Sequence, residues 1–169
     1  MELEQAIYQR RSVRKYLPDP VPESAVQKLM EYAMAAPSAC NKKPWEFFVV
    51  TDPEILQKLR HTHMFTNYNS PMIIIVAGNP KKALPGKQKE FWIQDCTAAL
   101  ENILLGALEL GLGTCWCGLY PNERAADSVR EVIGAEEHIV PMALLHVGYP
   151  AEHPAPRTQF DEKKVHYLK

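Results

Sequence analysis

The sequence predicts one domain of mixed α-helices and β-strands, for three reasons. Its 169 residues, 46% hydrophobic and 23% charged, are typical of a single globular domain and not of a disordered chain. Segments with helical periodicity alternate with segments rich in β-branched and aromatic residues. Residues 72–78 are apolar at nearly every position, which indicates a central strand covered on both faces. We therefore expect a single domain over residues 1–169.

The first quarter of the chain predicts two helices separated by extended backbone. Apolar residues recur at helical spacing between residues 3 and 7 and indicate a short first helix. Three prolines within residues 18–22 then force extended backbone. A second helix is expected from Pro22 onward and should stop before Pro37.

The middle of the chain predicts a strand, a short helix, the central strand and a long helix. Residues 45–51 are aromatic and β-branched, which favours a strand, and Asp52 with Pro53 is a typical helix start. Apolar residues spaced by threes and fours predict a helix over residues 90–112. Because this helix carries few charges, much of its circumference should be buried, and a second chain could supply part of the cover.

Two glycines end the long helix. Gly111 and Gly113 follow a helix and precede a strand, whereas a dinucleotide-binding loop needs the order strand, glycines, helix. We therefore interpret both as a helix cap in left-handed conformation. A third strand over residues 114–120, a helix over 122–133 and a fourth strand over 142–149 complete the prediction.

The segment after Pro150 is rich in proline and poor in apolar residues. Such a tail cannot hold its own structure, so we expect it to lie along another surface, which could be a neighbouring subunit's sheet.

The positive and negative charges of the chain nearly balance, so the protein as a whole does not attract polyanions. The chain has 19 Lys and Arg against 20 Asp and Glu, a formal net charge of -1. We therefore expect no nucleic-acid partner, although a local basic patch stays as a weaker alternative. The apolar stretches are too short to cross a membrane, and the acidic start does not resemble a signal peptide, so we expect a cytoplasmic protein without a membrane partner.

The cysteines and histidines do not predict a metal site. Cys115 and Cys117 are two residues apart, so a strand would place them on one face with Trp116 on the other. A zinc site needs two further ligands at matching spacing, and none is present. His61 and His63 could chelate together, but buried or surface roles explain both pairs better.

A basic run predicts a phosphate-binding corner. Arg10, Arg11, Arg14 and Lys15 lie within six residues and flank the hydroxyl of Ser12, where a helix gives way to extended chain. Guanidinium groups bind phosphate through paired, charge-assisted hydrogen bonds. A solvated charged surface is the alternative interpretation.

A second unusual stretch runs from Ala36 to Trp45. It leaves a helix and enters a strand with small residues, and it contains the hydroxyl of Ser38 and the amide of Asn41. Such groups beside rigid backbone suit hydrogen bonding to the edge of a flat heterocycle, and a plain loop is the alternative.

In their order and spacing these stretches resemble the FMN-dependent nitroreductase family over nearly the whole chain. The matching parts are residues 10–16, 36–38 with Asn41, 44–47, 95–105 leading into 111–114, and a basic residue in the tail. The resemblance implies an α+β fold with a central, mostly antiparallel sheet flanked by helices. It also implies an intertwined homodimer in which the C-terminal segments are exchanged as strands between partners.

The resemblance also implies which residues bind FMN, non-covalently and at the dimer interface. Arg10 and Ser12, with Arg11 beside them, would bind the phosphate together with Arg157. Arg14 would lie towards the pyrimidine edge, and Asn67 would face the ring. The remaining residues are Pro37, Ser38 and Asn41 from the other subunit, and the backbone of Trp116, Cys117 and Gly118 near the reactive flavin nitrogen.

The implied function is an NAD(P)H oxidoreductase. Hydride from NADH or NADPH would pass through bound FMN to nitro compounds, quinones or a related small acceptor. The chemistry would belong to the cofactor, so no side-chain nucleophile, general base or metal is expected. Many family members carry a glutamate where this chain has Cys117, and the chain is short for the family. A more open pocket, or a flavin-binding protein for storage, delivery or redox sensing without efficient turnover, is therefore the alternative.

Overall fold

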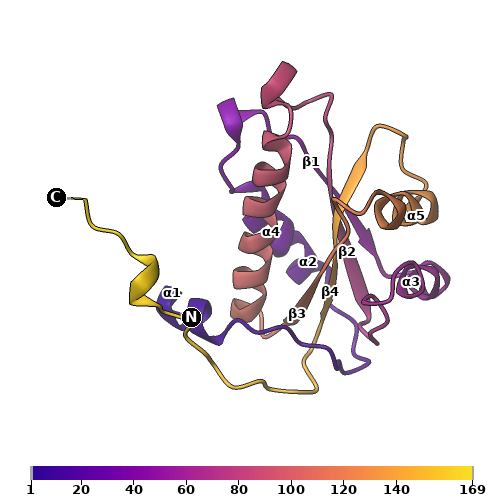
Figure 1. The fold of residues 1–169 in the computed structure, drawn as a ribbon. Helices are drawn as coiled ribbons and strands as arrows, with labels where there is room; N and C mark the ends of the chain where they lie inside the picture. The colour runs from indigo at the N-terminus through magenta and orange to yellow at the C-terminus, as the bar shows by residue number, and fades with distance from the viewer. Residues whose placement is uncertain (1, 169) are drawn as a thin grey trace.

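The computed structural model describes residues 2–168, and every helix and strand expected from the sequence is present in it (Figure 1). The helices are α1 (Leu3–Gln9), α2 (Glu23–Met34), α3 (Pro53–Arg60), α4 (Phe91–Glu109) and α5 (Glu123–Ile133). The strands are β1 (Trp45–Val50), β2 (Met72–Gly78), β3 (Gly113–Gly118) and β4 (Val140–Gly148). Short 3-10 turns lie at η1 (Ala39–Asn41), η2 (Gly86–Gln88) and η3 (Glu162–Lys164).

The four strands form one sheet in the order β1-β2-β4-β3, and every neighbouring pair is antiparallel. This confirms the α+β class and the antiparallel sheet. β2 and β4 are central, whereas β3 ends the sheet on one side. The outer edge of β3, like that of β1 at the other side, is therefore a place where another chain segment or a ligand can meet backbone hydrogen-bonding groups.

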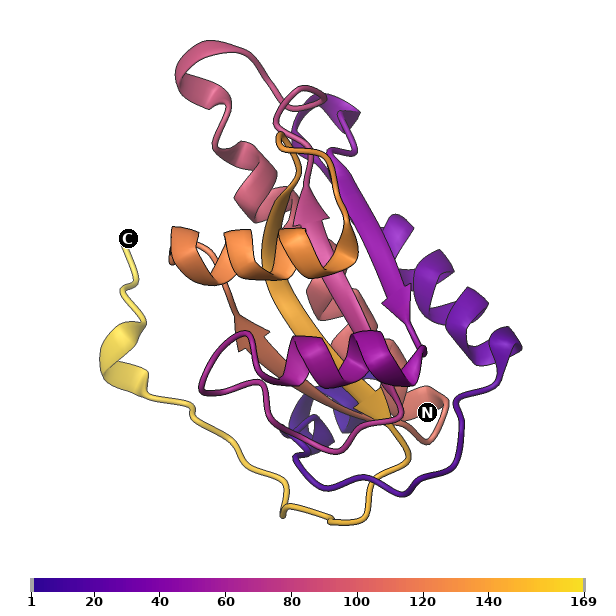
Figure 2. The same cartoon turned by 90° about the vertical axis from the view of Figure 1, so that its right-hand side faces the viewer.

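Two apolar cores lie on opposite faces of the sheet. α2 and α4 cover one face, and α3 and α5 cover the other (Figures 1 and 2). All of Met72–Gly78 is buried, which confirms that β2 is a central strand covered on both sides. Ile74 packs with the α2 and α4 side and Ile75 with the α3 and α5 side, as the alternation along a strand requires.

α4 spans the domain. Its 19 residues give a length of about 28 Å at 1.5 Å per residue. One side is buried in the core through residues such as Leu100 and Ile103, both fully buried, while Phe91 stays 38% exposed. Its two ends therefore mark two regions of the molecule that are far apart.

Alternation along β3 separates its cysteines from its tryptophan. Cys115 and Cys117 are buried in the core on the α3 and α5 side, and the side chain of Trp116 is 39% exposed. This confirms that the two thiols share one face. Cys40 lies elsewhere, exposed in η1.

The two glycines after α4 have different roles. Gly111 adopts φ 68°, the left-handed conformation expected of a helix cap. The same expectation for Gly113 is wrong, because Gly113 is the first residue of β3 and is not in that conformation. A Cβ atom at Gly113 would lie 2.9 Å from the side chain of Val13, so this position needs glycine for close approach of the N-terminal segment.

The N-terminal segment and the tail run beside each other. Ser12 forms a parallel bridge with Thr114, and Tyr16 forms an antiparallel bridge with Pro150. The tail then passes α1 and leaves the sheet (Figure 1). The Ala151 N–H donates to the Lys15 carbonyl at 2.9 Å. The early part of the tail thus lies along its own chain, whereas Phe160, Tyr167 and Leu168 are at least 78% exposed.

Within residues 2–168, no helix combines the length and the apolar character that a bilayer crossing requires. Nor do three or more His, Cys, Asp or Glu side chains of this range gather in a way that could hold a metal ion.

Candidate functional site

The outer edge of β3 is partly covered by the N-terminal segment and partly open. The Val13 N–H donates to the Thr114 carbonyl at 2.8 Å, so the backbone groups of Thr114 point away from β4. Alternate residues of an antiparallel strand point their N–H and C=O groups to the same side. The backbone groups of Trp116 and Gly118 therefore also point outward, past the end of the covering segment. Gly118 is exposed, and a Cβ atom there would meet nothing within 4 Å, so no side chain covers this end of the strand.

The loop between α3 and β2 borders this open edge. The thiol of Cys117 donates to the Phe65 carbonyl at 3.0 Å, which fixes the loop against β3. The side chain of Asn69 accepts from the Tyr16 N–H at 3.1 Å and donates to the Tyr16 carbonyl at 2.9 Å. Asn67 lies between these anchors and is exposed.

Arg14 lies where the N-terminal segment, the loop and the tail meet. A hydrogen bond with the side chain of Tyr68 raises the pKa of Arg14 above its ordinary value. The Arg14 N–H donates to the carboxylate of Glu152 at 2.6 Å. The Arg14 side chain is itself exposed, so a permanent positive charge faces solvent beside the open edge.

The pKa values of the two buried thiols are shifted in opposite directions. The neighbouring Cys117 and the positive charge of Arg14 lower the pKa of Cys115, against the effect of burial. The neighbouring Cys115 and burial raise the pKa of Cys117. Cys115 is thus the thiol that ionises first.

Arg10 and Arg157 come from opposite ends of the chain and line one pocket of about 180 Å³. The Arg157 N–H donates to the Tyr8 carbonyl at 3.4 Å, which holds the tail at the end of α1. Neither guanidinium forms an ion pair with a described residue, and no described carboxylate lines the pocket. Two unpaired cations at one pocket favour an anionic ligand.

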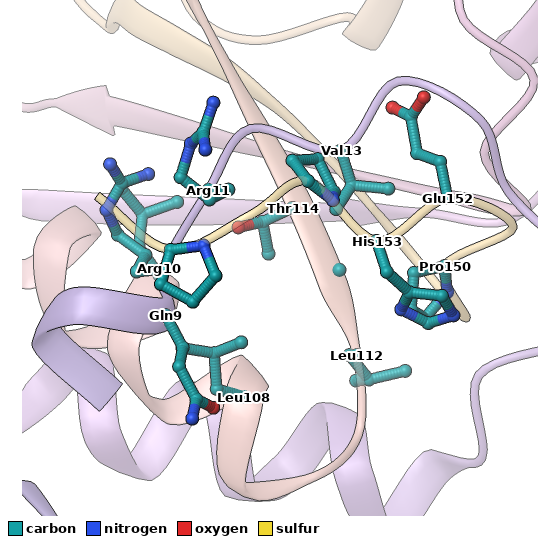
Figure 3. A pocket seen from close by; sticks show the side chains of 14 residues that line it. Gln9, Arg10, Arg11, Val13, Leu108, Leu112, Thr114, Pro150, Glu152 and His153 are labelled. Atoms are coloured by element: carbon teal, nitrogen blue, oxygen red, sulfur yellow. The ribbon is translucent and has the colours of Figure 1, made fainter. Parts of the chain in front are cut away.

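A second pocket, of about 230 Å³, continues from Arg10 along the N-terminal segment. Arg10 and Arg11 lie at one end of it, and Glu152 and His153 lie at the other (Figure 3). Arg11 is already engaged, because its guanidinium donates to the Ala155 carbonyl. In this chain Arg11 therefore holds the tail in place.

Ser12 is half-buried between these arginines and Thr114. Its hydroxyl makes no hydrogen bond with another described residue, so it stays available as a donor.

Pro37, Ser38 and Asn41 are not brought together with the arginines. The Ser38 hydroxyl accepts from the Lys43 N–H at 2.9 Å, and the Ala39 N–H donates to Asp95 at 2.8 Å, near the start of α4. Arg10 shares a pocket with Leu108 near the other end of the same helix. Asp95 and Leu108 are 13 positions apart in α4, which corresponds to about 20 Å along the helix axis. Within one chain these two groups therefore cannot hold the same phosphate.

Two further residues at this site escaped the sequence analysis. Tyr68 adjoins the predicted Asn67 and binds Arg14, and Glu152 follows the last strand and binds the Arg14 backbone. Their contacts join segments more than 50 residues apart, so neither periodicity nor local spacing could reveal them. The only available signal was the position of Tyr68 next to Asn67.

Comparison with known proteins places these features in context. The family model described as Nitroreductase family matches residues 7–66 and 61–149. A Methanothermobacter thermautotrophicus protein named "Putative NADH dehydrogenase/NAD(P)H nitroreductase" is 40% identical over 172 residues, covering 100% of this chain and 88% of the relative. A Thermus thermophilus protein named NADH dehydrogenase is 31% identical over 98% of this chain and 95% of the relative. The solved structure of an FMN-dependent nitroreductase from Clostridium difficile has a TM-score of 0.88 and 29% identity, covering 98% of this chain and 99% of that one.

Proposed function

Because the chain belongs to the nitroreductase family, we propose that it is an FMN-dependent NAD(P)H oxidoreductase that reduces nitro compounds, quinones or a related small acceptor. The Clostridium difficile relative is named as FMN-dependent, and the names of the two sequence relatives include nicotinamide nucleotides. When bound, FMN supplies two-electron transfer between the nicotinamide and the acceptor.

The proposal rests on two guanidinium groups, those of Arg10 and Arg157, which line one pocket and form no ion pair with another described residue. A phosphate monoester carries nearly two negative charges at neutral pH, and two guanidinium groups neutralise it with paired hydrogen bonds. The hydroxyl of Ser12 adds a further donor nearby. The residues of this corner therefore fit the phosphate end of FMN.

The open edge of β3 fits the ring end of the same cofactor. The outward N–H groups of Trp116 and Gly118 supply hydrogen-bond donors beside it. Arg14 places a positive charge that would stabilise negative charge on a reduced pyrimidine ring, which raises its potential. The side chains of this site bind and orient, and we assign none of them as a nucleophile or a general base.

The distant group of Pro37, Ser38 and Asn41 supports a homodimer. Since these residues lie about 20 Å along α4 from Arg10, they reach the cofactor of a partner subunit and not that of their own chain. The exposed apolar residues of the tail, Phe160 and Tyr167 among them, then pack on the partner's sheet. Burial of such side chains is a main source of dimer stability.

Light scattering should give a molar mass of twice the 19.2 kDa of the chain. Removing residues 158–169 should shift the equilibrium towards monomers, because the apolar tail residues are lost. A matched control replaces only Lys163 and Lys164 in the exposed η3 turn by glutamine and should stay dimeric. A monomeric full-length chain at micromolar concentration would contradict the proposed assembly.

The activity is tested on the purified holoprotein. The protein should be yellow, release FMN on denaturation, and lose its visible absorbance when NADH or NADPH is added without air. A nitro compound or a quinone should then restore the absorbance. A colourless protein that takes up no added FMN would overturn the proposal, and slow reduction by both nicotinamides would favour the storage or sensing alternative.

A further inference from the structure

A separate pocket of about 530 Å³ lies between the loop after α3 and the start of α5. We call it the Arg124 pocket; its lining residues are His61, Thr62, His63, Met64, Asn122, Arg124, Ala125 and Ser128. It shares no residue with the two pockets lined by Arg10. The phosphate corner of the FMN site therefore does not account for it.

The Arg124 pocket is cationic and rich in hydrogen-bond donors. Arg124 forms no ion pair with a described residue, and no described carboxylate lines the pocket. The nearest acid on the following turn of α5, Asp127, is paired with Arg130 at 2.7 Å. Thr62 and Ser128 add two hydroxyl groups. Such a donor set suits an anionic oxygen ligand.

Each histidine of the pocket keeps one ring N–H free. The side-chain amide nitrogen of Gln57 lies 3.0 Å from Nε2 of His61, which favours the tautomer with its proton on Nδ1. The Phe65 N–H points to Nδ1 of His63 at 3.5 Å, which favours a proton on Nε2. Both imidazoles therefore stay potential donors even when neutral.

The Arg124 pocket adjoins the open edge of β3. The hydrogen bond from Cys117 to Phe65 ties its loop to the strand, and the loop and the start of α5 lie on the side of that edge (Figure 2). Gly118 and Asn122 are four residues apart, so their Cα atoms are separated by at most about 14 Å. One elongated ligand is therefore long enough to occupy both places.

We propose that the Arg124 pocket binds a phosphate group of the nicotinamide dinucleotide while its nicotinamide ring lies at the open edge of β3. This inference rests on the proposed oxidoreductase function. A dinucleotide is long and carries its phosphates away from the reactive ring. A small nitro compound or quinone bound at the open edge of β3 would be too short to reach the Arg124 pocket as well. The occupant is therefore the electron donor and not the acceptor.

The first test compares Arg124→Gln with Lys58→Gln, which removes the same charge from an exposed position on α3 outside the pocket. Arg124→Gln should raise the KM for NADPH, for NADH or for both about tenfold, the loss of one charge-assisted hydrogen bond, with little change in kcat. Arg124→Lys should recover part of the loss. A rise confined to NADPH identifies its extra phosphate as the ligand, and a rise for both donors identifies the pyrophosphate. Unchanged KM values for both donors, or equal effects of Lys58→Gln, would overturn the inference.

A second arm separates donor from acceptor. Protein reduced with dithionite is reoxidised by 4-nitrobenzoate, which is anionic, and by 4-nitrobenzyl alcohol, which is neutral. Arg124→Gln should leave both rates unchanged. A selective loss with 4-nitrobenzoate, without any change in donor KM, would assign the pocket to an anionic acceptor and refute the dinucleotide.

A third arm does not depend on turnover. Adenosine 2′,5′-bisphosphate is titrated into the protein while the ring protons of His61 and His63 are followed by NMR. Both signals should shift, and the Kd should be about tenfold weaker in Arg124→Gln. If the chain bound no FMN, the oxidoreductase proposal would fail, yet these shifts would still report an anion site. Absent shifts would overturn the pocket assignment by themselves.

Discussion

Replacing Arg10 by alanine should weaken FMN binding by about 2 to 5 kcal/mol, which is roughly 30-fold or more in Kd. The guanidinium of Arg10 lines a pocket with that of Arg157 and has no carboxylate partner among the described residues, so a bound phosphate would be its counter-ion. When one of the two cations is removed, the bound phosphate still loses its water, but only one guanidinium group remains to neutralise its negative charge. Fluorescence titration of the flavin-free protein with FMN measures the loss.

The matched control for this prediction is Lys15→Ala. Lys15 belongs to the same basic run, is exposed and lines none of the pockets at this corner. It should change FMN affinity little. Arg157→Ala should weaken FMN binding about as much as Arg10→Ala. Because both side chains act on one phosphate, the loss of FMN binding energy in the double variant should differ from the sum of the two single losses. Unaltered affinity in Arg10→Ala would disprove the phosphate assignment.

Acidification from pH 6.5 to pH 4 should lower the free energy of unfolding by about 3 kcal/mol through His146 alone. This side chain is fully buried, its Nδ1 lies 2.7 Å from the Ser70 hydroxyl, and its Nε2 has no hydrogen-bond partner among residues 2–168. Burial, with the nearby charge of Arg60, lowers the pKa of His146 to about 4. Below pH 6.5 the unfolded chain takes up a proton that the folded chain does not, so stability falls until the folded form also titrates.

Urea unfolding at a series of pH values measures this effect, with His146→Gln as the variant that lacks the group. The difference between the two pH profiles isolates His146 from the carboxylates that titrate in the same range. His153→Gln removes an exposed histidine of the tail and should leave the profile unchanged. Direct NMR titration should show one imidazole that stays neutral down to about pH 4, and a His146 that titrates near pH 6.5 would contradict the prediction.

Much of the fold could be predicted because its determinants are local. The burial of β2 follows from an uninterrupted apolar run, and the start of α3 follows from Asp52, whose carboxylate accepts from the Glu54 and Ile55 N–H groups at 2.9 and 3.0 Å. The left-handed conformation of Gly111 likewise follows from its position at the end of a helix. The expectation for Gly113 failed because the reason for glycine there is contact with Val13, 100 residues earlier in the chain, which no local pattern records.

The candidate site could likewise be predicted only in part. Arg10, Arg14 and the other cations of the basic run were visible as a cluster of charges, but not which of them stay unpaired. The structure shows that Arg11 is used by the tail, that Arg14 lies beside Tyr68, and that Arg10 shares a pocket with Arg157.

The secondary structure, the common face of Cys115 and Cys117, and the residue types able to bind a phosphate follow from local sequence, since periodicity, caps and charge depend on neighbours along the chain. The position of β3 at the edge of the sheet, and the contact of the tail with the end of α1, follow only from the packing of distant segments. The same packing brings the loop after α3 and the start of α5 together around the Arg124 pocket. These features arise from packing between segments far apart in the sequence, where a strand's position in the sheet and the path of a tail are fixed by burial and hydrogen bonding of the whole domain.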